Sequence, residues 1–304
     1  MDRWLELSLE TDAETAEAIH EALFPIVGGR VALEQLHCPD AAPADRWENE
    51  APQGPVIVRA WLALDQPEAD QTRARVERAL AALRLIRPLP AGRWREVRQS
   101  DWAEAWRTAF HPLRIGERLL IRPSWIQAEA VEARPGDITI VLDPGMAFGT
   151  GLHPTTQLCA LAMMKHIQAD ERVLDVGCGS GILSILAAKL GASVVLGVDT
   201  DAEAVRVSRE NAALNGVADR VRFAHGSFEL ADQVHDWAIA NILAPVIARL
   251  LAEGLANYGR RFIFSGILKS QEEQVRRACE EARLSLCEEQ QLGDWVALVA
   301  QHAS

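Results

Sequence analysis

The sequence lacks an apolar run long enough to cross a membrane. A spanning helix needs about 20 consecutive apolar residues, and no stretch of this 304-residue chain reaches that length. The first residues, MDRWLELSLE, are acidic and have neither the basic leader nor the apolar centre of a secretory signal. We therefore expect a cytoplasmic protein with no membrane partner.

Cysteine is scarce and scattered. The five cysteines never form a C-x-x-C pair and never lie beside a pair of histidines; they are Cys38, Cys159, Cys178, Cys279 and Cys287. Closely paired cysteines are typical of zinc sites, and even numbers of cysteines are typical of disulfide frameworks. The pattern therefore predicts neither a metal site nor disulfides.

Positive charge is also in short supply. The chain has 31 lysines and arginines against 43 acidic residues, which gives a formal net charge of -12. Nucleic-acid affinity rests mainly on basic side chains that neutralise phosphates, so we expect no direct nucleic-acid specificity. An acidic chain suits a basic protein partner better; the alternative interpretation is that the acidity only keeps the protein soluble.

Residues 1–98 predict a small α+β domain. Strands are expected at 4–9, 30–37, 56–64 and 94–98, and helices at 12–24 and 67–85. The order β-α-β-β-α-β is that of a ferredoxin-like fold, a scaffold that hosts many functions. A proline-rich, charged loop from Pro39 to Pro55 interrupts it, and residues 99–112 predict an interdomain linker with an amphipathic helix at 101–110.

Residues 113–304 predict a doubly wound, Rossmann-like α/β sheet. Two paired strands and a helix, at 117–121, 138–142 and 155–167, precede a regular alternation. In it, strands at 173–176, 194–199, 221–224, 237–240 and 262–265 alternate with helices at 182–190, 202–215, 245–256 and 270–283. A final hairpin, 284–289 and 295–300 joined at Gly293, predicts seven strands with the last one antiparallel.

A glycine-rich turn follows the first strand of this alternation. Asp175 is followed by Gly177, Gly179 and Gly181, and a helix begins at once, so the backbone can approach a ligand closely. A dinucleotide fingerprint would read G-x-G-x-x-G. The tighter G-x-G-x-G after an acidic residue is the form found in S-adenosylmethionine enzymes, whose ligand carries a sulfonium and an amino group. The alternative is an ordinary tight turn.

Asp199 supports the cofactor interpretation. It ends the second strand of the alternation, 18 residues after Gly181. There its carboxylate could accept hydrogen bonds from both ribose hydroxyls of the cofactor. The glycine turn and Asp199 together predict an S-adenosylmethionine site and hence a methyltransferase.

A second glycine-rich segment, 143–156, precedes the sheet. It reads DPGMAFGTGLHPTT and could fold over the pocket as a lid. Phe148 and the hydroxyl of Thr156 are expected to contact the methionine part of the cofactor. The alternative is a capped connection with Thr155 or Thr156 as the N-cap. His153 is a weak candidate for a base, because a single histidine in such a loop more often bonds to the backbone.

Asn241 ends the fourth strand of the alternation, in the sequence ANIL. Strand ends of an open parallel sheet face the ligand crevice, so Asn241 is expected beside the reacting methyl group, where its carbonyl oxygen could orient an incoming amine. This makes Asn241 the catalytic candidate. The alternative is a structural asparagine at the start of the next helix.

The motifs FGTGLHPTT (148–156), LDVGCGSGILSILAAKLGA (174–192), ANILAPVI (240–247) and SGIL (265–268) together resemble the PrmA family, which methylates ribosomal protein L11 in bacteria. The resemblance covers the whole chain. It implies that Thr156, Gly177, Asp199 and Asn241 contact the cofactor, and that the N-terminal domain grips the ribosomal substrate. The implied targets are lysine side chains and the N-terminal α-amine. Leu152 and the Pro39–Pro55 insertion depart from the family pattern.

Three other functions fit the same residues. Nucleic-acid amino-methyltransferases carry an Asn or Asp at this strand end but usually continue as N-P-P-aromatic, where this chain has Ile242 and Leu243. A lysine methyltransferase of another protein would look much the same. A non-catalytic S-adenosylmethionine-binding protein of the ribosome is the third, although the intact glycines, Asp199 and Asn241 disfavour it.

Overall fold

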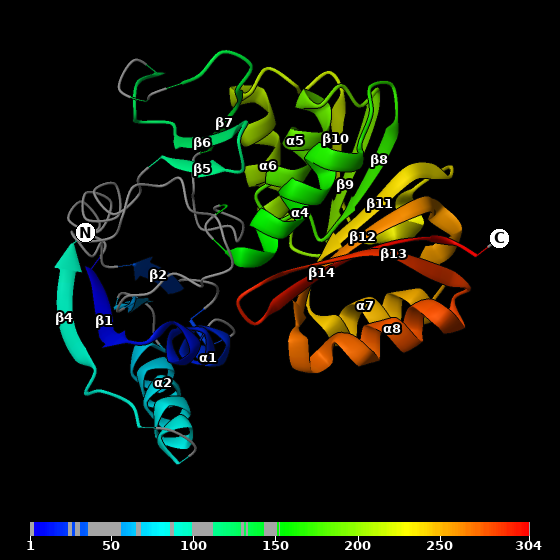
Figure 1. The fold of residues 1–304 in the computed structure, drawn as a ribbon. Helices are drawn as coiled ribbons and strands as arrows, with labels where there is room; N and C mark the ends of the chain where they lie inside the picture. Colours follow the sequence, from blue (N-terminus) through cyan, green and yellow to red (C-terminus); the bar gives the residue numbers. More distant parts are fainter. Residues whose placement is uncertain are drawn as a thin grey trace. The chain divides into compact units, whose positions relative to one another are not determined.

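The structure, a computed structural model, describes residues 3–23, 26–27, 31–35, 56–64, 68–85, 88–98, 112–128, 131, 133–142, 151 and 153–303. The chain divides into two compact units, Met1–His111 and Pro112–Ser304 (Figure 1). Of the predicted linker, only Pro112 is described. The predicted helix at 101–110 and the Pro39–Pro55 insertion therefore lie outside the described residues.

The first unit has the ferredoxin-like fold predicted from the sequence. Its elements are β1 (Arg3–Thr11), α1 (Ala13–Leu23), β2 (Val31–Gln35), β3 (Val56–Ala63), α2 (Ala69–Arg84) and β4 (Arg93–Arg98). The strands form one antiparallel sheet in the order β2-β3-β1-β4. Because side chains alternate along a strand, Leu5, Leu7 and Leu9 share one face of β1 and join the core with Val76 and Leu80 of α2.

The second unit contains the predicted seven-stranded sheet. Its strands are β8 (Arg172–Val176), β9 (Val194–Asp199), β10 (Val221–His225), β11 (His235–Asn241), β12 (Gly259–Leu268), β13 (Leu284–Leu292) and β14 (Trp295–His302). They lie in the order β10-β9-β8-β11-β12-β14-β13. The first five are parallel, and β14 pairs antiparallel with both β12 and β13.

Helices cover both faces of this sheet. Figure 1 shows α4 (Pro154–His166), α5 (Ile182–Lys189) and α6 (Ala202–Leu214) on one face, and α7 (Ala244–Ala252) and α8 (Glu272–Glu281) on the other. The sequence predicted a longer α7, to residue 256. Gly254, at φ +104°, ends it earlier, and a 3-10 turn, η3 (Leu255–Tyr258), follows. Two further 3-10 turns are η2 (Phe228–Leu230) and η4 (Lys269–Gln271).

A small three-stranded sheet precedes α4. It consists of β5 (Leu113–Ile115), β6 (Leu119–Pro123) and β7 (Ile138–Leu142), in that order. The predicted pairing of two strands is confirmed as the parallel pair β6–β7. The strand predicted from residue 117 begins only at Leu119, because Gly116, at φ +55°, turns the chain between β5 and β6.

The strand order predicts where a ligand binds to this sheet. The sheet reverses direction of growth between β8 and β11, and open α/β sheets bind ligands outside the carboxyl ends of the strands at such a switch point. The glycine turn after β8 and Asn241 at the end of β11 both lie there. Among the described residues, no helix is both long enough and apolar enough to cross a bilayer.

Candidate active site

The glycine loop joins β8 to α5. Gly177, Gly179 and Gly181 have φ angles of 76°, 54° and 81°, values that residues with a side chain rarely adopt. The loop is tied to β9, because the Gly177 N–H donates to the Val198 carbonyl at 2.8 Å. A Cβ atom on Gly177 would lie 2.4 Å from Cγ2 of Ile242. Both backbone shape and close packing therefore require glycine in this loop.

Asp199 lies beside that loop at the end of β9. Its Oδ2 accepts the Gly179 N–H at 2.9 Å, and its Oδ1 accepts the Asp201 N–H at 2.9 Å. A carboxylate oxygen can accept two hydrogen bonds, so each oxygen keeps the capacity for one more. The two backbone N–H groups thus hold the carboxylate in one orientation. In this orientation it can accept hydrogen bonds from two neighbouring hydroxyl groups of a ligand.

Asp175, near the end of β8, is almost fully buried at 1% exposure. Its Oδ2 accepts a hydrogen bond from the Ser184 hydroxyl at 2.6 Å, while its buried Oδ1 has no partner among the described residues. Burial raises the pKa of Asp175 to about 6; the negative charge of Asp199 adds to this shift, and the Ser184 hydrogen bond opposes it. Because buried acceptors are rarely left unpaired, Asp175 suits a ligand that brings a donor or a positive charge.

Asn241 and Thr156 meet at the ends of β11 and α4. The Asn241 Nδ2 lies 3.3 Å from the Thr156 Oγ1, which it can reach as a donor. Thr156 is buried and Asn241 is half-buried. With its amide nitrogen directed at Thr156, Asn241 keeps its amide oxygen as an acceptor. The structure therefore brings together two predicted site residues that are 85 positions apart in the chain.

His153 is a capping residue of α4. Its Nδ1 accepts the Thr155 N–H at 3.3 Å and lies 2.7 Å from the Thr155 hydroxyl, and its ring packs edge-on against Trp295. Pro154 follows as the first helical residue. The alternative interpretation, in which Thr155 or Thr156 is the N-cap, is wrong about the capping residue, because the N-cap is His153, which has an extended backbone. With Nδ1 engaged in the cap, His153 is a poor candidate for a base.

The remaining predicted contact is untested by the structure. Phe148 and its segment, 143–150, lie outside the described residues, as does Leu152. Phe148 therefore stays a prediction, and so does a lid.

Sequence reasoning missed several polar residues that shape the site. Asn211 of α6 is buried, and its Nδ2 donates to the Ser180 carbonyl at 2.9 Å, inside the glycine loop. Ser184 of α5 is fully buried against Asp175. The sequence could have identified Ser184, because a single hydroxyl within the apolar run ILSILAAK needs a buried hydrogen-bond partner.

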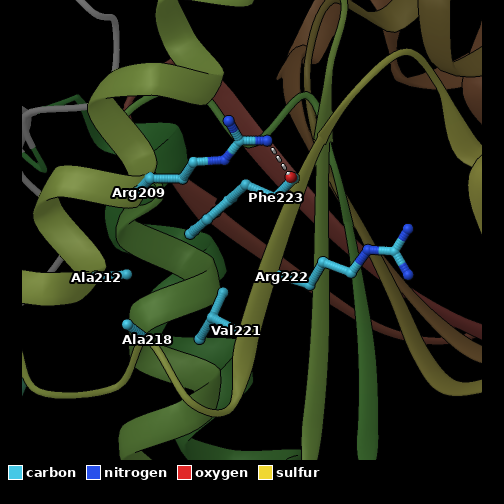
Figure 2. Close-up of a pocket in the computed structure, with 6 residues that line it drawn as sticks. All are labelled: Arg209, Ala212, Ala218, Val221, Arg222 and Phe223. Atoms are coloured by element: carbon cyan, nitrogen blue, oxygen red, sulfur yellow. Dashed lines mark hydrogen bonds between the residues drawn. The ribbon is translucent and has the colours of Figure 1, made fainter.

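A separate hollow lies between α6 and the edge strand β10 (Figure 2). Its lining residues are Arg209, Ala212, Ala218, Val221, Arg222 and Phe223, none of them predicted as a site residue. The Arg209 guanidinium donates to the Phe223 carbonyl at 2.8 Å, and Figure 2 shows Arg222 pointing away from Arg209. Arg209 thereby covers an acceptor on the open sheet edge, which protects the edge from further pairing.

The cysteines give a direct test of the packing in the second unit. Burial raises the thiol pKa of Cys159, Cys178 and Cys279, whereas Cys287 is exposed. Because the thiolate is the reactive form, an aromatic disulfide reagent should react quickly with Cys287. We expect Cys287→Ser to remove one rapidly reacting thiol from the native protein. An unchanged count of fast thiols in that variant would contradict this packing.

Among the described residues, no group of three or more histidine, cysteine or acidic side chains could hold a metal ion. The polar groups gathered at the switch point are instead two carboxylates, an amide and a hydroxyl, from Asp175, Asp199, Asn241 and Thr156. This set matches a ligand with hydroxyl donors and positive charge, such as the predicted cofactor.

Comparison with known proteins agrees with this chemistry. The family model "Ribosomal protein L11 methyltransferase (PrmA)" matches residues 3–303. A protein named ribosomal protein L11 methyltransferase from Chloroflexus aurantiacus is 38% identical, over 97% of this chain and 97% of its own length. One of the same name from Herpetosiphon aurantiacus is 39% identical, over 97% and 98%.

A solved structure shows the same similarity. The crystal structure of ribosomal protein L11 methylase from Lactobacillus delbrueckii subsp. bulgaricus is 33% identical, with a TM-score of 0.58, and the match covers 64% of this chain and 100% of that one. The resemblance predicted from the motifs is confirmed, and with it S-adenosylmethionine as the methyl donor. The chain belongs to the ribosomal protein L11 methyltransferase (PrmA) family.

Proposed function

We propose that this protein transfers methyl groups from S-adenosylmethionine to lysine ε-amines and to the N-terminal α-amine of ribosomal protein L11. The observation that carries the proposal is the meeting of Asn241 and Thr156 beside the glycine loop. It puts an amide acceptor next to the predicted cofactor cradle. The names of the relatives, together with their coverage of nearly the whole chain, support L11 as the substrate.

The residues at the switch point fit the cofactor. When bound, S-adenosylmethionine supplies an activated methyl group on a positively charged sulfur. Asp199 would accept hydrogen bonds from the two ribose hydroxyls with the acceptor capacity left on its oxygens. Asp175, whose buried Oδ1 has no partner in the described part of the chain, would balance the positive charge of the methionine part. Gly177, Gly179 and Gly181 leave room for close approach, and Phe148 and Thr156 would line the methionine end.

Asn241 would then act on the substrate amine. A lysine amine has a reference pKa near 10.4, so it is almost wholly protonated at neutral pH and must lose a proton before it can attack. Desolvation in the crevice, close to a positive charge, lowers the amine pKa. The Asn241 amide oxygen would accept a hydrogen bond from the neutral amine and direct its lone pair at the methyl carbon. Alignment of this kind supplies a large part of a rate enhancement.

The two units would have different roles in this reaction. The ferredoxin-like N-terminal domain would recognise the ribosomal substrate, the predicted linker at 99–112 would join it to the catalytic domain, and the protein would act in the cytoplasm. An acidic chain, with a net charge of -12, suits a basic ribosomal protein by charge complementarity. It also disfavours direct recognition of nucleic acid.

Peptide mapping tests the choice of amine. Unmethylated L11, free and within large subunits, is incubated with the protein and S-adenosylmethionine, and modified peptides are located by mass spectrometry. We expect methyl groups on lysine nitrogens and on the N-terminal nitrogen. Methylation confined to another residue type, such as glutamine or arginine, would contradict the amine assignment while leaving methyl transfer to L11 intact.

A further inference from the structure

We propose that Ser265 and Gly266 of β12 are positioning residues that fix Thr156 and Asn241 relative to one another. This inference rests on the proposed function, because it concerns the two side chains to which that function assigns the cofactor and the amine. Neither Ser265 nor Gly266 is expected to touch the cofactor. Each acts through the residues that line the crevice.

Ser265 bonds to both segments that carry the proposed site residues Thr156 and Asn241. It is fully buried, and its hydroxyl donates to the Thr155 carbonyl at 3.1 Å, in the first turn of α4. Its own carbonyl accepts the Ile242 N–H at 3.2 Å, and it pairs in register with Asn241. One residue thus joins the backbone before Thr156 to the backbone after Asn241.

Gly266 fixes the peptide that follows Asn241. It has a φ of +81°, and a Cβ there would lie 2.2, 2.7 and 3.0 Å from the O, C and N atoms of Ile242. Backbone atoms cannot give way as the end of a flexible side chain can. The absence of a side chain at Gly266 therefore allows the Ile242 backbone to lie against β12. On its other side Ile242 packs against Gly177, where a Cβ would lie 2.4 Å from Cγ2.

Ser265 and Gly266 lie in a β-bulge, and this irregularity allows them to contact the segments that carry Thr156 and Asn241. The pairing of β12 with β14 runs through Phe264 and Leu298, then resumes at Ile267 and Val296. Three steps along β12 therefore match two along β14, so β12 carries one extra residue. Bulges re-aim side chains and occur often beside active sites. Here the bulge coincides with the register position of Asn241.

Helix α4 is held independently at its other end. Lys165 and His166, in its last turn, contact the Glu288 carboxylate at 2.8 and 2.7 Å. Burial opposes ionisation of Glu288, but hydrogen bonds from Lys165, Gln290 and His166 outweigh it and lower its pKa to about 2. Loss of the Ser265 hydroxyl should therefore loosen the first turn of α4 and leave the helix in place.

Ser265→Ala tests the proposal with the full-length protein. Removing one buried hydrogen bond and shifting the first turn of α4 should lower kcat/KM for methyl transfer to L11 about tenfold. If Ser265 acts through Thr156, Ser265→Ala made in a Thr156→Ala background should lower kcat/KM by less than about twofold. Ser265→Cys, which restores only a weak donor, should recover part of the activity.

A matched control separates positioning from general destabilisation. Val275 is fully buried in α8, and Val275→Ala should lower the melting temperature while leaving kcat/KM unchanged. Gly266→Ala is a second test, expected to lower kcat/KM more than Ser265→Ala because the added methyl meets backbone. Circular dichroism confirms that each variant is folded before its kinetics are compared.

The outcomes distinguish this inference from the function on which it rests. Full additivity of Ser265→Ala and Thr156→Ala, or an equal loss of kcat/KM in Val275→Ala, would overturn the positioning role. If Thr156→Ala and Asn241→Ala themselves left cofactor affinity and turnover unchanged, the assignment of those two residues would fail instead.

Discussion

Replacing Asn241 with alanine is expected to lower kcat for methyl transfer by about a hundredfold. The reason is geometric. Asn241 lies at the switch point with its Nδ2 directed at the Thr156 hydroxyl, which leaves its amide oxygen as the acceptor that we propose for the substrate amine. Alanine removes that acceptor and leaves the strand end and the glycine loop in place. Steady-state kinetics with L11 at saturating S-adenosylmethionine measure the effect.

Calorimetric titration of the cofactor completes this experiment. Asn241→Ala should weaken S-adenosylmethionine binding only a few-fold, because Asp199 and Asp175 carry most of the proposed contacts. Asn257→Ala is the matched control, since Asn257 is exposed in η3, which precedes the amino end of β12, whereas the site lies at the carboxyl ends of the strands. Unchanged turnover in Asn241→Ala, with cofactor binding intact, would show that Asn241 does not orient the amine.

Replacing Asp175 with asparagine is expected to stabilise the free protein and weaken cofactor binding. Burial raises the pKa of Asp175 to about 6, well above the usual range of an aspartate side chain. Holding it ionised at neutral pH therefore costs about 3 kcal/mol of folding free energy. Asparagine is nearly isosteric and uncharged, so the variant avoids this cost. It also loses the negative charge proposed for the methionine end, so its affinity for S-adenosylmethionine should fall at least tenfold.

The stability that Asp175→Asn gains over wild type should increase with pH. A carboxyl group with a raised folded-state pKa binds its proton more tightly in the folded state. The stability that this gives is fully present below the unfolded pKa and is lost as pH rises through the folded pKa. The excess unfolding free energy of Asp175→Asn over wild type should therefore be small near pH 4, grow up to about pH 6, and stay constant above it.

Urea unfolding of both proteins across this pH range measures the difference. Asp219→Asn, at an exposed position, is the control and should shift stability little at any of these pH values. A lower stability of Asp175→Asn than of wild type at pH 8 would contradict an ionised, poorly solvated Asp175. Unchanged cofactor affinity would separately remove Asp175 from the binding site.

The features predicted correctly from the sequence are those encoded locally. The glycine turn, the position of Asp199 at the end of β9, and the alternation of strands and helices each depend on a short window, where periodicity and backbone preference are decisive. The closing hairpin and its antiparallel last strand were also predicted, whereas the position of β14 between β12 and β13 is known only from the structure. The strand at Leu113–Ile115 was missed because three residues carry no periodicity, and its pairing depends on β6.

What the sequence could not predict depends on contacts between distant segments. Ser265 and the Thr155 carbonyl are 110 positions apart, and Asn211 and the Ser180 carbonyl are 31 apart. Nothing in the neighbourhood of Ser265 shows that its hydroxyl is buried or which carbonyl it reaches. His153 as a cap was likewise hidden, because histidine is not among the preferred capping residues and its ring depends on Trp295.

We propose that this crevice transfers methyl groups to an amine of a ribosomal protein. The most direct measurement is incubation of the protein with methyl-labelled S-adenosylmethionine and whole ribosomes from a strain lacking the activity, followed by separation of rRNA from the ribosomal proteins. We predict that the label appears on one small protein, L11, and that the Asn241→Ala variant transfers far less of it. Label on rRNA, or no transfer by the wild-type protein, would contradict methyl transfer from this crevice to a ribosomal protein.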